Sequence, residues 1–161
     1  MIEVMMDQAR ADVEGGDGLC TLGLAVCIGV AIVGEYPTKA AEGETRHDKF
    51  LAHLADGPMM EVTFNSLKRQ VDAAKAKGLR RLKVKMSVVE PETLRQDGEF
   101  SWSEGAIKQT KTTNALYMNK VRELTRSSSG PALMRVEKHN INNAADIEIL
   151  ASKDIRILIQ G

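Results

Sequence analysis

An uncharged run from Leu19 to Gly34 constrains this chain more than any other feature. The run is mostly apolar, so a folded protein must bury it away from water. Its 16 residues fall short of the roughly 20 that a helix needs to cross a bilayer. Acids rather than basic residues flank it, at Asp17 and Glu35. We therefore expect a buried core segment and no contact with a membrane.

Hydrophobic periodicity cannot assign the secondary structure of this run, because apolar residues occupy nearly every position. As a helix it would be fully buried, although Gly23 and Gly29 would each cost about 1 kcal/mol relative to alanine. As strands it would divide near Gly29, with Val30–Val33 as a β-rich second piece. We favour the helix and keep the two strands as the alternative.

Two further helices are predicted in the first part of the chain. Apolar residues recur at a spacing near 3.6 between residues 2 and 14, and glycines end this pattern. A second apolar face predicts a helix over 46–55, which Asp56, Gly57 and Pro58 end. The residues that carry the two faces are Ile2, Met5, Met6, Ala9 and Val13, then Phe50, Leu51 and Leu54.

The remainder of the chain mixes strands and helices. Leu82, Val84, Met86 and Val88 alternate with Arg81, Lys83, Lys85 and Ser87, which predicts a strand with one apolar and one cationic face. Other strands are expected at 60–64, 100–102, 132–138 and 155–159, and helices at 66–77 and 113–126. Residues 146–151 fit either a hairpin strand or a helix.

The formal net charge of zero conceals an asymmetry along the chain. Residues 1–58 carry a net charge of −6 and residues 59–161 a net charge of +6. We predict an α+β protein in which a helical, acidic N-terminal part (1–58) precedes a small, basic α/β part (59–161) with a mostly antiparallel sheet, or both in a single compact domain. Opposite charges could pair within one chain or head-to-tail between subunits.

The densest basic stretch has a single acid, Asp72, among its cations, which are Lys68, Arg69, Lys75, Lys77, Arg80, Arg81, Lys83 and Lys85. Such a cluster attracts anions. Residues 65–99 contain no aromatic side chain on which a base could stack. The stretch therefore predicts a salt-sensitive, sequence-indifferent contact with the phosphates of DNA or RNA.

The segment from Arg46 to His53 resembles the active-site motif of the HEPN family of small helical ribonucleases, in which an arginine and a histidine lie on one helix. The resemblance implies a metal-independent ribonuclease that acts as a dimer. It also implies that Arg46 stabilises charge on the phosphate and that His53 transfers a proton. Both residue types suit this chemistry.

Metal and cofactor chemistry is not expected. The spacing of Cys20 and Cys27 is wider than in zinc fingers, and both lie in the apolar run. The acidic start of the chain is unlike a signal peptide. We predict a cytoplasmic, homo-oligomeric, non-enzymatic protein that presents the basic stretch to nucleic acid or another polyanion. The alternative is a HEPN-like ribonuclease that uses Arg46 and His53.

Overall fold

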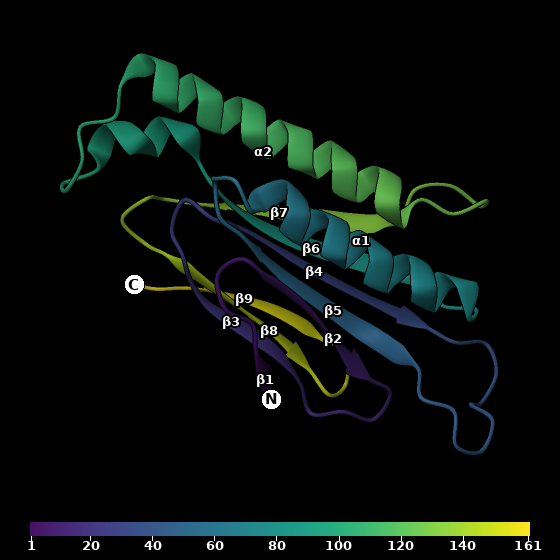
Figure 1. Cartoon of the computed structure of the whole chain (residues 1–161). Coiled ribbons are helices and arrows are strands. Elements are labelled where there is room, and N and C mark those ends of the chain that lie inside the picture. Colours follow the sequence, from purple (N-terminus) through teal and green to yellow (C-terminus); the bar gives the residue numbers. More distant parts are fainter.

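The computed structural model describes all of residues 1–161. Two β-sheets stack face to face, and two long helices cover the outer face of the larger sheet (Figure 1). The helices are α1 (Met60–Ala76) and α2 (Glu104–Thr125), with a short 3₁₀ helix at Pro91–Gln96. The strands are β1 (Ile2–Glu3), β2 (Gln8–Val13), β3 (Gly18–Leu24), β4 (Ile28–Glu35), β5 (His47–Leu54), β6 (Arg80–Val89), β7 (Leu133–His139), β8 (Ala145–Leu150) and β9 (Ile155–Ile159).

Both sheets combine strands from the two ends of the chain. The five-stranded sheet has the order β2-β5-β4-β6-β7 and is antiparallel except for the β6–β7 pair. The four-stranded sheet has the order β1-β3-β8-β9 and is antiparallel except for β1–β3. Strands from the acidic part (1–58) and from the basic part (59–161) therefore lie side by side, as β4 beside β6 and β3 beside β8.

The core has two layers, and β4 contributes to both. Val30 and Ile32 pack under the helices, whereas Ala31 and Val33 pack against the four-stranded sheet. A strand that is covered on both faces is apolar at successive positions and shows no alternation. This burial explains why the apolar run could not be assigned from its periodicity.

The predicted helical N-terminal part is wrong. Strands make up 38% of the chain and helices 28%, and the chain begins with strands. Residues 2–14 form β1 and β2, the apolar run forms β3 and β4, and the helix expected over 46–55 is β5. In β2 the apolar side chains that face α1 are Ala9 and Ala11. These are small residues, so the period-two pattern of β2 is weak in the sequence, and pairing with β5 decides its conformation.

The second part of the chain agrees more closely with the sequence. The strand predicted by alternation is confirmed as β6. The helices expected at 66–77 and 113–126 are confirmed as parts of α1 and α2, each of which ends one residue earlier and begins several residues before its predicted start. The open assignment at 146–151 resolves to β8. Two short predictions are wrong: 60–64 is the start of α1, and 100–102 lies outside any strand.

A buried ammonium group ties the edge of the large sheet together. Lys49 on β5 is fully buried and donates to Asp48 and to the carbonyl of Val13, both at 2.8 Å. Its Nζ also lies 3.6 Å from Asp12, whose carboxylate accepts the backbone N–H of Gly18 at the start of β3. The cluster thus links β2 and β5 to the smaller sheet.

Lys49→Met should strongly destabilise the protein. It would leave the buried carboxylate of Asp12 without a close cation and Asp48 with Lys153 alone, at 3.8 Å; removing one partner of a buried ion pair typically costs about 3–5 kcal/mol. The free energy of unfolding in urea measures this loss. Lys68→Met is the control, because it breaks an exposed pair with Asp72, which should cost less than about 1 kcal/mol. Equal losses in the two variants would contradict a stabilising role for the buried cluster.

Candidate anion-binding groove

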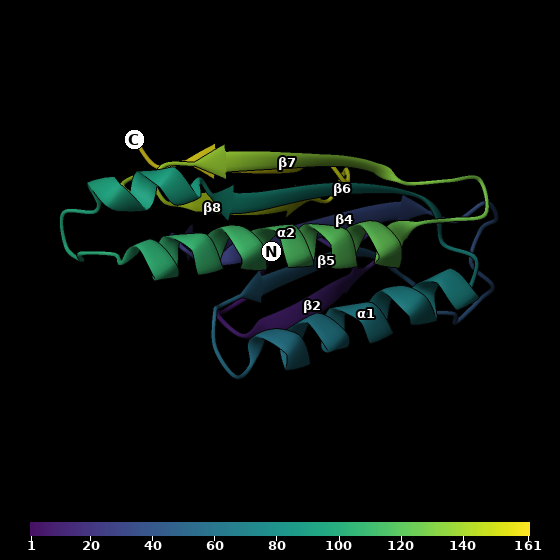
Figure 2. The ribbon, with the colours of Figure 1, turned by 90° about the horizontal axis from the view of Figure 1, so that it is seen from above.

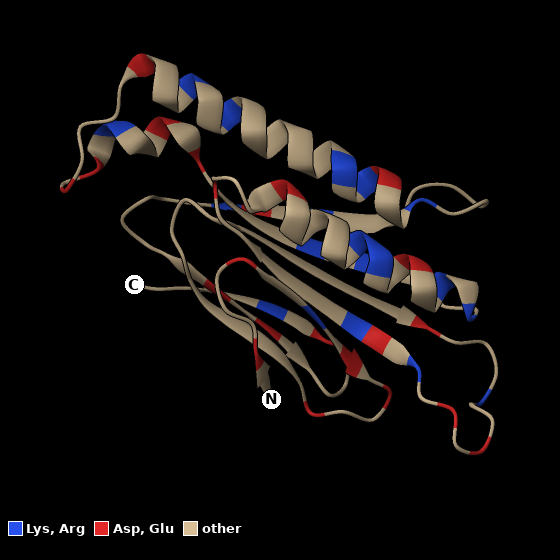
Figure 3. Ribbon diagram, viewed as in Figure 1, with Lys and Arg blue, Asp and Glu red and all other residues tan.

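The structure separates the sequence-predicted cations onto two faces of the large sheet. Three of them lie on α1, which covers one face, and Lys77 directly follows the helix. Figure 3 shows basic segments on both helices and on strands of the layers below. On β6, Leu82 and Val84 pack under the helices, so Lys83 and Lys85 project from the opposite face. The eight cations therefore do not form one surface.

Two of the α1 lysines already bond to other parts of the protein. Lys68 pairs with Asp72 at 2.8 Å on the same helix. Lys75 donates to the carbonyl of Leu124 at 3.0 Å, where α2 ends. The positive charge on α1 thus serves partly to hold the helices, and α1 is a weaker candidate for binding an anion than the far face of β6.

Cations lie beside one another on the far face of β6 and β7. The parallel register sets Lys83 beside Leu133 and Lys85 beside Arg135. Neighbouring strand positions bring side chains on one face close together, and like charges there repel. No acid lies among these four positions, so this part of the sheet carries unbalanced positive charge.

The turn between β8 and β9 forms the other wall of a groove over these residues. Lys153, Asp154, Ile155 and Arg156 line a cavity of about 670 Å³ together with residues of β6 and β7. This volume is within the range of small-molecule sites, roughly 300–1,000 Å³. The lining contains five cations and a single acid, Asp154.

The cations of this groove fall into two groups. Lys85 donates to the carbonyl of Ile155 at 2.9 Å, and Lys153 donates to the carbonyl of Gly34 at 3.0 Å. These two lysines join the walls of the groove to each other and to β4. The remaining three cations are exposed and have no ion-pair partner, so they can contact a ligand: Lys83, Arg135 and Arg156.

Three groove cations were not singled out by the sequence reasoning. Arg135 sits in the strand predicted at 132–138, but its position beside Lys85 depends on the β6–β7 register. Lys153 and Arg156 come from a turn and an edge strand that fold over β6. None of them belongs to a run of basic residues, so no local pattern marked them.

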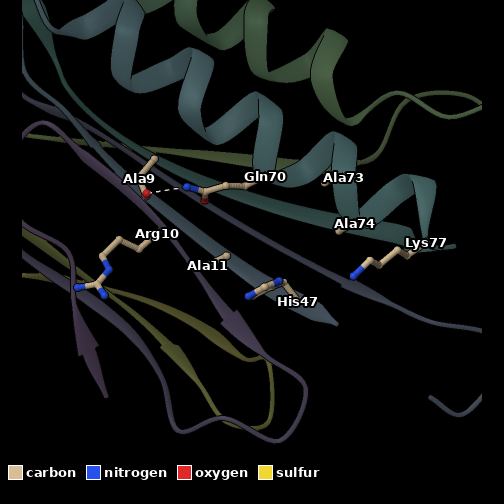
Figure 4. Close-up of a pocket in the computed structure, with 8 residues that line it drawn as sticks. All are labelled: Ala9, Arg10, Ala11, His47, Gln70, Ala73, Ala74 and Lys77. Atoms are coloured by element: carbon tan, nitrogen blue, oxygen red, sulfur yellow. Dashed lines mark hydrogen bonds between the residues drawn. The ribbon is translucent and has the colours of Figure 1, made fainter. Parts of the chain in front are cut away.

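A second basic pocket lies between β2 and α1. Its volume is about 440 Å³, and its basic lining residues are Arg10, His47 and Lys77 (Figure 4). In Figure 4 the Arg10 side chain points away from the other two. Lys77 also donates to the carbonyl of Thr45 at 3.2 Å. The three basic groups do not converge, so this pocket is a weaker anion site than the groove.

The structure does not bring Arg46 and His53 together. The helix that the HEPN resemblance requires is β5, and two residues at this separation along an extended chain lie roughly 20 Å apart. Arg46 donates to Glu14 at 2.6 Å and lies 4.1 Å above the ring of Tyr36. It therefore anchors the connections around β5 and is not free to hold a phosphate.

His53 is buried between the two sheets. Its Nδ1 lies 2.7 Å from the hydroxyl of Thr21, which donates to the carbonyl of Val4. The hydroxyl proton is thus used, so we assign the ring proton to Nδ1, which donates to Thr21. Burial lowers the pKa of His53, and the charge of Asp7 partly opposes this shift. His53 is a neutral bridge between β5 and β3.

Neither cysteine has the environment of a nucleophile or a metal ligand. Burial raises the pKa of the Cys27 thiol, and the charges of Asp7 and Asp56 raise it further. Burial also raises the pKa of Cys20. No group of three His, Cys, Asp or Glu side chains could hold a metal ion. Neither long helix is apolar enough to cross a membrane.

Comparison with known proteins assigns no family. No protein-family model matches the sequence, and no curated protein is significantly similar to it. The function must therefore be argued from the residues of this chain and their positions. The groove beside β6 gathers five cations against one acid in about 670 Å³. A smaller cavity of about 290 Å³ has the same net charge, because Lys75, Arg80, Arg81 and Lys83 line it without an acid.

The buried imidazole of His53 should make stability depend on pH. Because its pKa is lower in the folded state, the unfolded chain binds the proton more readily. The stability that the neutral imidazole contributes is fully present above the pKa of the unfolded chain, about 6.5, and is lost as the pH falls below that value. Urea midpoints at about pH 7.5 and 5.5 should differ less for His53→Gln than for the wild type. The exposed His47→Gln should behave like the wild type, and the opposite ranking would contradict the assignment.

Proposed function

We propose that this protein is a non-enzymatic binding protein whose groove between β6, β7 and β9 holds a phosphate-bearing polyanion, with nucleic acid as the favoured class. The observation that carries the proposal is the placement of Lys83, Lys85 and Arg135 on one face of neighbouring strands. Their mutual repulsion lowers stability, and a bound anion relieves it. The bond from Lys85 to Ile155 gives that lysine a structural role, but no such contact explains Lys83 or Arg135.

The second wall of the groove adds to the attraction. Arg156 and Lys153 come from the other sheet, so an anion in the groove meets positive charge from two sides. Charges of one sign along a cleft raise the local concentration of ligands of opposite sign and speed their association. Asp154 is the single acid in the lining and offsets only a small part of this field.

The spacing of the groove cations favours a polymer with repeated charges. Lys83 and Arg135 are diagonal neighbours on adjacent strands, which places them roughly 7–8 Å from each other. They can therefore contact successive phosphates of an extended single strand. No aromatic residue lines the groove, so bases cannot stack there. We expect DNA and RNA to bind alike and with little sequence preference.

The lining residues support binding without a reaction. They supply positive charge and hydrogen-bond donors, and Asp154 is the one carboxylate among them. The two histidines with hydrogen-bonded rings, His53 and His139, lie elsewhere and are buried.

Reversing two groove charges should weaken binding. Lys83→Glu combined with Arg135→Glu should reduce the affinity for a labelled single strand of DNA or RNA at least tenfold, because two phosphate contacts become repulsive. Fluorescence anisotropy as a function of salt measures this effect. The salt slope should fall by about 1.4, at roughly 0.7 per lost contact to a single strand.

The matched control is Lys108→Glu with Lys111→Glu, which makes the same change of charge on exposed positions of α2. It should lower the affinity much less. Equal losses in the two double variants would mean that overall charge, and not the groove, governs binding. Unchanged affinity in the groove variant would reject the proposal.

A further inference from the structure

β9 is the least protected strand edge of the molecule. At the β2 edge, Gln70 of α1 donates to the carbonyl of Ala9 at 2.7 Å and so occupies it. The β7 edge strand carries three charged residues in its sequence LMRVEKH. β9 has the sequence IRILI with a single charge, and Leu158 and Ile159 are each 46% exposed. Long apolar edges of this kind are templates for pairing with another strand.

The hydrogen bonds of β9 show which backbone groups remain open. Asp154 and Gln160 bond to β8 through their backbones. Along an antiparallel strand, the backbone N–H and C=O groups of successive residues point alternately to the two sides. Those of Ile155, Ile157 and Ile159 therefore point away from β8, to the open edge. Lys85 already occupies the outward carbonyl of Ile155. Ile157 and Ile159 are therefore the residues whose backbone N–H and C=O groups both remain open.

We infer that two copies of this chain pair through β9, antiparallel and around a two-fold axis at Leu158. In this register Ile157 of each copy lies opposite Ile159 of the other, and each pair exchanges both backbone hydrogen bonds. All the open groups of the two residues are satisfied, and the bond from Lys85 to Ile155 is retained. If the axis lay at Ile157 or at Ile159, some of the open backbone groups of these two residues would stay unpaired or would have to pair with groups of neighbouring residues.

The side chains agree with this register. Leu158 of one copy faces Leu158 of the other, which covers the exposed apolar surface on the outer side of the strand. Arg156 lies opposite Gln160, so no like charges meet across the interface. β9 is the last strand of its sheet, and Figure 2 shows the C-terminal end of the chain at the rim of the molecule, where a second copy can approach.

The paired strands join two four-stranded sheets into one continuous sheet with an isologous interface. Of the three free groove cations, Arg156 lies in the contact opposite Gln160, whereas Lys83 and Arg135 take no part in it, so reversing those two charges leaves the contact intact. Self-association expected from the charge asymmetry would weaken with salt. Pairing through backbone and apolar groups should persist in salt.

A cysteine at the axis tests the register directly. Residues 158 of the two copies form a non-hydrogen-bonded pair, whose Cα atoms lie about 4.5 Å apart, within the range of disulfides. Without reductant, Leu158→Cys should give at least ten times more disulfide-linked dimer than Leu116→Cys. Leu116 is the control because it is 50% exposed on α2, and both variants keep the two native cysteines.

A proline at the edge tests the hydrogen bonds. Ile159→Pro removes an outward N–H and leaves the ladder to β8 intact, so the variant should fold with little change in melting temperature. Its mass by sedimentation should be that of one 17.6 kDa chain, whereas the wild type should have twice this mass. Ile159→Thr keeps the amide and should remain dimeric.

Two results would overturn the inference: Leu158→Cys crosslinking no better than Leu116→Cys, or a wild type that stays monomeric at high concentration. The groove variant Lys83→Glu with Arg135→Glu separates the two proposals. It should lose polyanion binding and keep the dimeric mass. A dimeric wild type that binds no polyanion would reject the proposed function and leave this interface standing.

Discussion

The burial of β4 on both faces is the constraint on which the rest of this structure depends. The strand must be covered by the helices on one side and by a second sheet on the other, because its side chains are apolar in both directions. At Gly29 a Cβ atom would collide with the side chains of Ile147 and Leu24. The glycine therefore lets the smaller sheet pack closely against β4 at this position. The two-sheet arrangement follows from the need to cover this single strand.

Secondary structure could be predicted from the sequence where an element has a polar outer face. The prediction was wrong where charged side chains are buried. β6 was predicted because its cations alternate with apolar residues that pack under the helices. β5 was mistaken for a helix because Lys49 and His53 on it are charged or polar by type and yet buried. No local pattern reveals that Lys49 is neutralised by Asp12 from another strand, since this pairing exists only after folding.

The same limit applies to the groove. Lys83 and Lys85 were predicted because they are close in sequence, whereas Arg135 reaches their side through the parallel β6–β7 register. Register between distant strands depends on the whole sheet and is not written in a short segment. The cations of α1 were grouped with them by proximity in sequence, but of these only Lys75 shares a cavity with Lys83 and none lines the groove. A basic run in a sequence therefore locates charge but does not show which charges share a surface.

Lys153 connects the groove to the buried charges that stabilise the fold. Its backbone φ of 73° is rare for a residue with a side chain. Its ammonium donates to Gly34 on β4 and lies 3.8 Å from the buried Asp48. The turn that forms one groove wall is thus held in place before any ligand arrives, which reduces the entropy that binding must overcome. In the proposed two-fold dimer two such walls are present, so a polymer that reached both grooves would meet the second at a high effective concentration. Modest affinity at one groove is then sufficient for tight binding of a long polyanion.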